Sequence, residues 1–139
     1  MVPTGLSLSL VVLLFYGYGF GLGMSSGQED DVKEKSPVEI ITKIRSLLNQ
    51  TIAEYQNKNF SGASALVEEA YLENYEFIEA PLAEQNETLM EETEVKLREE
   101  LRDLVKDDGK ETDVQLLVEK INTNLNQADL FLANQSTKN

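Results

Sequence analysis

The chain has 139 residues, with 25 aspartates and glutamates against 12 lysines and arginines, and a formal net charge of −13 at pH 7. It contains neither histidine nor cysteine, which excludes disulfides, thiolate zinc sites, histidine-bound haem and a Ser-His-Asp triad. The negative charge also repels nucleic acid. We expect a non-enzymatic protein. The alternative is an enzyme that uses carboxylates for acid–base chemistry, but the sequence predicts no loop long enough to build such a site.

An uncharged, largely apolar run from Gly5 to Met24 begins the chain, and the first charged side chain is Glu29. About 20 apolar residues are enough to cross a bilayer core, so residues 1–24 are predicted to be a signal peptide or an N-terminal membrane anchor. Gly21 and Gly23 are small residues at a cleavage boundary, which favours removal. The lack of a lysine or arginine before the run is atypical of a signal and favours retention.

The residues that follow the apolar run indicate an extracytoplasmic location. Glu29, Asp30 and Asp31 form an acidic flank, whereas positive charge is what holds a flank in the cytoplasm. We therefore expect a secreted or membrane-anchored protein. The glycosylation sequon Asn-x-Ser/Thr occurs four times, at Asn49, Asn59, Asn86 and Asn134.

Residues 25–35 are predicted to be a flexible linker, and residues 36–133 an all-helical domain. Ser36 and Glu39 match a capping box, and Pro37 suits the first helical position. The helix is expected to end near Lys58. Its apolar stripe consists of Ile41, Ile44, Leu48, Ile52 and Tyr55.

A second helix is predicted to begin at Ser61 and to break or kink near Glu79, because Pro81 follows. Asn74 lies in the middle of its apolar face, and a buried amide needs hydrogen-bond partners. The other inward residues are Ala63, Leu66, Val67, Ala70, Tyr71, Phe77 and Ile78.

A third helix is predicted from about Glu84 to Val105, followed by a turn at residues 107–110 and a fourth helix capped by Asp113. Residues 134–139 are predicted to be a disordered tail. The pattern favours an all-α, antiparallel four-helix bundle, and the alternative is that the second and third helices form one long kinked helix. The inward residues of the third and fourth helices are Met90, Thr93, Leu97, Leu101, Leu104, Val114, Leu117, Val118, Ile121, Leu125, Ala128 and Leu132.

Ten glutamates and no lysine or arginine lie between Asn59 and Val95. Helical spacing places Glu69, Glu73 and Glu76 on one flank of the second helix. Glu79 lies one step further round that helix, and Glu94 lies at the inward edge of the third helix. An all-oxygen set of this kind suits an iron, manganese or calcium ion. The candidate metal ligands are Glu73, Glu76, Glu79 and Glu94.

Two other interpretations of the acidic run stay open. Charged helix flanks are commonly just solvated, and a negative surface also suits a basic protein partner. Glu94 and Arg98 have i,i+4 spacing, which predicts a modest surface salt bridge.

The segments Ala70–Leu82 and Thr93–Arg102 resemble the extracytoplasmic helical domain attached to high-affinity iron permeases of the oxidase-dependent type, over about 33 residues. By this resemblance Glu76, Glu79 and Glu94 are the matched acids and Arg102 is the matched base. The resemblance implies an iron-acquisition context beside a membrane transporter. The membrane part and its Arg-Glu-x-x-Glu motifs are missing from this chain, so a module that binds, senses or delivers a cation is what carries over.

The sequence is therefore consistent with two functions. One is an exported, non-enzymatic, acidic helical module that binds a cation. The alternative is a structural or protein-interaction domain at the cell surface, with a solvated acidic face.

Overall fold

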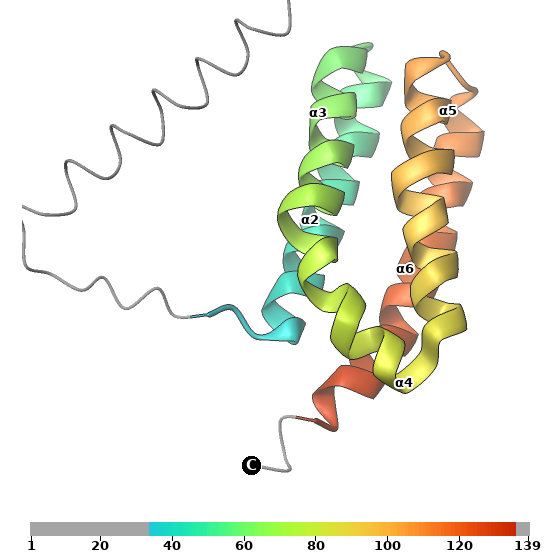
Figure 1. The fold of residues 1–139 in the computed structure, drawn as a ribbon. Helices are drawn as coiled ribbons and strands as arrows, with labels where there is room; N and C mark the ends of the chain where they lie inside the picture. Colours follow the sequence, from blue (N-terminus) through green and yellow to red (C-terminus); the bar gives the residue numbers. More distant parts are fainter. Residues whose placement is uncertain (1–33, 136–139) are drawn as a thin grey trace, which may run out of the picture. The chain divides into compact units, whose positions relative to one another are not determined.

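The computed structural model describes residues 34–135, which are helical apart from short connections and contain no β-strand (Figure 1). The all-helical prediction is therefore confirmed for this part of the chain. Residues 1–24 and most of the predicted linker lie outside the described residues, as does the tail beyond Gln135. The elements, with η denoting a π-helix, are α2 (Pro37–Gln56), α3 (Phe60–Ala70), η1 (Tyr71–Tyr75), α4 (Glu76–Val95), η2 (Lys96–Leu101), α5 (Arg102–Lys106) and α6 (Glu111–Ala133).

The capping box at the start of α2 is confirmed. The Ser36 hydroxyl accepts a hydrogen bond from the Glu39 backbone N–H at 3.3 Å, and the Ser36 N–H donates to the Glu39 carboxylate at 2.8 Å. Within the predicted stripe, Ile52 is only half-buried, while the other members are buried. Local capping chemistry and apolar spacing are therefore enough to define this helix.

Two predicted helix starts are wrong. The helix α3 begins at Phe60 rather than at Ser61, and the Asn59 side-chain oxygen caps it by accepting a hydrogen bond from the Gly62 N–H at 3.2 Å. The helix α6 begins at Glu111 after Lys110, and no side chain caps it, whereas Asp113 was expected to do so. Lys110 is the extended residue that precedes the helix, and Asp113 already lies in its first turn, where its N–H donates to the Lys110 carbonyl at 2.9 Å.

The predicted break at Pro81 is also wrong, since Pro81 lies within helical α4 and the break occurs at Asn86. Asn86 has φ −158° and ψ 90°, so α4 consists of two helical pieces that join at this residue. The Asn86 side-chain oxygen accepts a hydrogen bond from the Leu89 N–H at 3.0 Å. A proline removes one backbone donor, whereas a new helix start needs an acceptor for its free N–H groups, and Asn86 provides it.

The π-helical segment η1 changes which residues face inward. A π-turn contains an extra residue, so the buried positions after it advance along the sequence. Phe77, predicted to be inward, is 68% exposed, while Ile78 is fully buried. The predicted inward position of Phe77 is therefore wrong, whereas that of Ile78 is confirmed.

The helices pack around one core. The helix α2 packs against α3 and α6, α4 packs against α6, and α3 packs against α5 (Figure 1). All seven predicted inward residues of α6 are buried. None of the helices within residues 34–135 is long and apolar enough to cross a membrane.

Candidate functional site

Two π-helical segments and both halves of α4 bring a tyrosine–carboxylate cluster together. We define this cluster as Tyr71 from η1, Glu79 and Glu94 from α4, and Arg98 from η2. π-Helical turns are rare and often occur at functional sites. The cluster is therefore a candidate functional site of this fold.

Glu94 is at the centre of the cluster. Its Oε1 accepts a hydrogen bond from Arg98 Nη1 at 3.0 Å and a longer one from the Tyr71 hydroxyl at 3.4 Å. The Arg98 guanidinium carbon lies 5.6 Å from the centroid of the Tyr71 ring, which is a cation–π distance. The predicted Glu94–Arg98 pair is confirmed, and the arginine supplies the carboxylate with a cation from within the chain.

Burial and neighbouring charge alter the acidity of the cluster. Burial raises the pKa of Glu79 above its ordinary value, and the charge of Glu94 raises it further. The Tyr71 hydroxyl and Arg98 oppose this rise. Burial and the two carboxylates also raise the pKa of Tyr71 to about 12. One oxygen of Glu79, Oε1, is buried and has no hydrogen-bond partner among the described residues.

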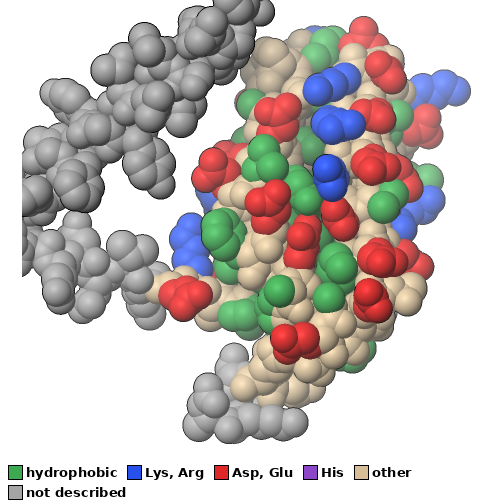
Figure 2. All heavy atoms as spheres, viewed as in Figure 1, with side chains coloured by type: hydrophobic (Ala, Val, Ile, Leu, Met, Phe, Trp, Pro, Cys, Tyr) green, Lys and Arg blue, Asp and Glu red, His purple; other side chains and the backbone are tan. Residues whose placement is uncertain are grey.

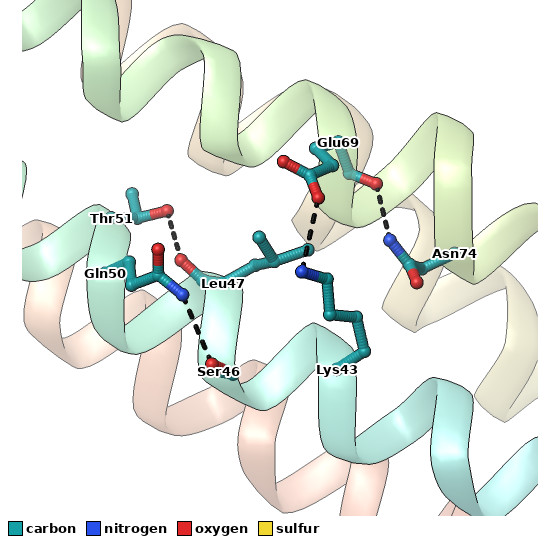
Figure 3. Close-up of polar contacts among 7 residues, drawn as sticks. All are labelled: Lys43, Ser46, Leu47, Gln50, Thr51, Glu69 and Asn74. Atoms are coloured by element: carbon teal, nitrogen blue, oxygen red, sulfur yellow. Dashed lines mark hydrogen bonds and ion pairs between the residues drawn. The ribbon is translucent and has the colours of Figure 1, made fainter.

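Tyr75 and Asn74 of η1 have structural roles. The Tyr75 hydroxyl, on a fully buried side chain, donates a hydrogen bond to the Met90 carbonyl at 2.8 Å. The Asn74 side-chain amide donates to the Glu69 carbonyl at 2.9 Å, so this buried amide finds the partner that its position requires (Figure 3). Lys43 Nζ lies 3.4 Å from Glu69 Oε1 and connects α2 to α3 (Figure 3).

The structure brings together only part of the predicted metal set. Glu79 and Glu94 meet in the cluster, and the charge of Glu76 adds to the rise in the pKa of Glu79. Glu73 is exposed and has no ion pair with a described residue. Across residues 34–135, no group of three or more carboxylates is arranged to hold a metal ion. The metal site stays a prediction, and Glu79 and Glu94 are its best-placed members.

The four sequon asparagines differ in their surroundings. Asn49 is exposed on α2, and Asn134 is exposed after α6. Asn59 and Asn86 use their side-chain oxygens as helix caps. Thr51, the third residue of the Asn49 sequon, is fully buried and its hydroxyl donates to the Leu47 carbonyl at 2.8 Å (Figure 3).

A basic groove that the sequence did not predict lies between α3 and the η2–α5 segment. Its volume is about 290 Å³. Figure 2 shows lysine and arginine side chains in a line over this seam, flanked by acidic side chains. Its basic residues are Arg98, Arg102 and Lys106. Their four-residue spacing places them on one helix face, and this was the signal in the sequence that could have indicated a basic surface. The groove is lined by Val67, Glu68, Tyr71, Leu72, Leu97, Arg98, Arg102 and Lys106.

No protein-family model, curated protein or solved structure matches the chain. The resemblance of residues 70–102 to the helical domain of iron permeases stays a prediction. Any function for the chain therefore rests on its own residues.

Proposed function

We propose that the chain is an exported, non-enzymatic, acidic helical module that binds a basic protein partner. One observation carries this proposal, namely that most carboxylates of the acidic run are exposed and have no ion pair with a described lysine or arginine. A negative surface of this kind attracts basic partners and speeds their association. Seven of the ten carboxylates belong to this set, namely Glu68, Glu73, Glu76, Glu84, Glu87, Glu91 and Glu92.

We also propose an antiparallel four-helix bundle as the architecture of the module. The break at Asn86 divides α4 into two pieces, which supports four helical segments rather than one long kinked helix. The packing of α2 against both α3 and α6 is typical of such a bundle.

The partner proposal is tested with a lysine-rich helical peptide as the basic probe, titrated by calorimetry into the full chain at low and moderate salt. The test variant replaces Glu84, Glu87, Glu91 and Glu92 with glutamine. The control removes four charges elsewhere, with Glu99, Glu100 and Glu119 changed to glutamine and Asp113 to asparagine. All eight positions are exposed.

We expect the test variant to lose about tenfold in affinity, or about 1.4 kcal/mol, and the control to lose much less. The comparison is matched, because both variants change the net charge equally. An equal loss in both variants would show a solvated surface with no preferred face, and would contradict the proposal.

A second candidate function is binding of an iron, manganese or calcium ion, in the iron-acquisition context that the resemblance implies. The buried, unpartnered oxygen of Glu79 beside Glu94 favours it. The test is calorimetric titration of the full chain with ferric, ferrous, manganese and calcium ions. Saturable binding that survives salt and is lost in the Glu79→Gln/Glu94→Gln variant supports this function. Weak heats that vanish with salt would rule it out.

A further inference from the structure

The basic groove lies directly beside an acidic, partly apolar ridge on the same face of the molecule. We define the ridge as Glu68 and Leu72, which lie four residues apart along α3 and η1. Leu72 is 54% exposed, and Glu68 is exposed as well. Both residues line the basic groove on one side of the ridge. They also line a second, acidic concavity on the other side, with Ala65, Glu69 and Glu73.

The charges of this face are not satisfied within one molecule. Glu68 and Lys106 line the same groove, yet neither has an ion pair among residues 34–135. Within the described part of the chain, the one ion pair of Arg102 is with the adjacent Asp103, at 3.1 Å on its own helix. Exposed ion pairs of this kind contribute little, so the guanidinium keeps donors for another carboxylate.

The ridge and the groove complement each other in chemistry and in spacing. The ridge presents one carboxylate and one leucine, one helical turn apart. The groove presents basic side chains at intervals of four residues, about 6 Å along a helix, beside the apolar atoms of Val67, Tyr71 and Leu97. A carboxylate from a second ridge would therefore meet the basic side chains while its leucine covers the apolar floor.

We propose that the protein forms a two-fold symmetric dimer in which the ridge of each copy occupies the basic groove of the other. A dimer of this type needs a surface that is complementary to itself. A two-fold axis that runs between ridge and groove, parallel to α3, exchanges the two features and makes both contacts at once. In the dimer Glu68 of each copy pairs with Arg102 of the other, and Leu72 is covered.

The overall negative charge does not prevent this association. Repulsion between the two chains is screened beyond about 8 Å at physiological ionic strength, whereas pairs in contact are screened less. The apolar contact of Leu72 adds a contribution that does not depend on salt.

The test is sedimentation of the full chain over a range of concentrations at physiological salt. The wild type is expected to show a reversible monomer–dimer equilibrium. Glu68→Arg and Arg102→Glu should each raise the dissociation constant about 100-fold, since each change removes an attractive pair twice across the axis. The double variant Glu68→Arg/Arg102→Glu should restore the dimer, because it exchanges the two charges.

The matched control reverses two exposed charges on α6, Glu119→Arg and Lys120→Glu, which should leave the equilibrium unchanged. Circular dichroism verifies that every variant keeps its helical content. A wild type that stays monomeric overturns the proposal. A dimer whose dissociation constant is unchanged by both single reversals also overturns the proposal. This is the result expected if the chains associate through the apolar residues 5–24. Failure of the double variant to recover would overturn the proposal as well.

Discussion

The hydroxyl of Tyr75 donates a 2.8 Å hydrogen bond to the backbone carbonyl of Met90 and so joins η1 to the second half of α4. The two residues lie on opposite sides of the kink at Asn86, and the tyrosine side chain is fully buried. This contact therefore holds the two arms of the kink together from the inside.

Tyr75→Phe is expected to lower the free energy of unfolding by about 1–2 kcal/mol, because the Met90 carbonyl loses its buried donor. Urea unfolding followed by circular dichroism measures the change. Tyr71→Phe is the matched control, since its bond to Glu94 is longer, at 3.4 Å, and should cost less. Equal costs for the two variants would contradict the special role of Tyr75.

Glu79→Gln is expected to stabilise the protein at pH 7. The pKa of Glu79 is raised in the folded state, so its ionised form disfavours folding above that pKa. The penalty disappears as the pH falls below the unfolded value of 4.5, where both states are protonated. Urea midpoints of the variant and the wild type should thus differ at pH 7 and converge near pH 4. A destabilised variant at pH 7 would contradict this expectation.

The free energy of unfolding is expected to fall as the pH rises above 10. Burial raises the pKa values of Tyr55 and Tyr75 above 10, and that of Tyr71 to about 12. The unfolded state therefore ionises first, so the stability present below pH 10 is lost progressively as the pH approaches the folded pKa values. Urea unfolding between pH 8 and pH 11.5 measures the trend. A constant free energy over this range would show that the hydroxyls ionise as easily in the folded state.

Asn86→Ala is expected to destabilise the protein by about 1 kcal/mol, because the Leu89 N–H loses its capping oxygen. Asn86→Asp keeps an acceptor at the same place and should cost less. Both variants also remove the sequon, so a glycan does not distort the comparison. Chemical unfolding of both proteins gives the difference, and a larger cost for aspartate would contradict the capping role.

The sequence predicted the parts of the fold that depend on local patterns. Ser36 and Glu39 locate the start of α2, and the apolar period of α6 identifies its buried face. The π-turns could not be predicted in this way, because a single inserted residue leaves no mark on composition. The exposure of Phe77 is the direct result, since periodicity alone placed it inside.

The candidate site shows the same division. The four-residue spacing of Glu94 and Arg98 was sufficient to predict their ion pair, which one helix determines. The proximity of Glu79 to Glu94 depends on the fold-back at Asn86, which the sequence suggested at Pro81 instead. The four-residue spacing of the basic residues indicates that they share one helix face, but the groove itself also requires α3 and α5 to pack against each other, which the spacing does not show.

The buried hydroxyl of Thr51 has a consequence for the biosynthesis of the chain. Oligosaccharide transfer to Asn49 requires the hydroxyl two residues later, and in the folded protein that hydroxyl bonds to the Leu47 carbonyl and is out of reach of solvent. A sugar on Asn49 must therefore be attached before α2 forms. If the chain is exported as proposed, occupancy at this position would record how long the nascent chain stays open before α2 forms.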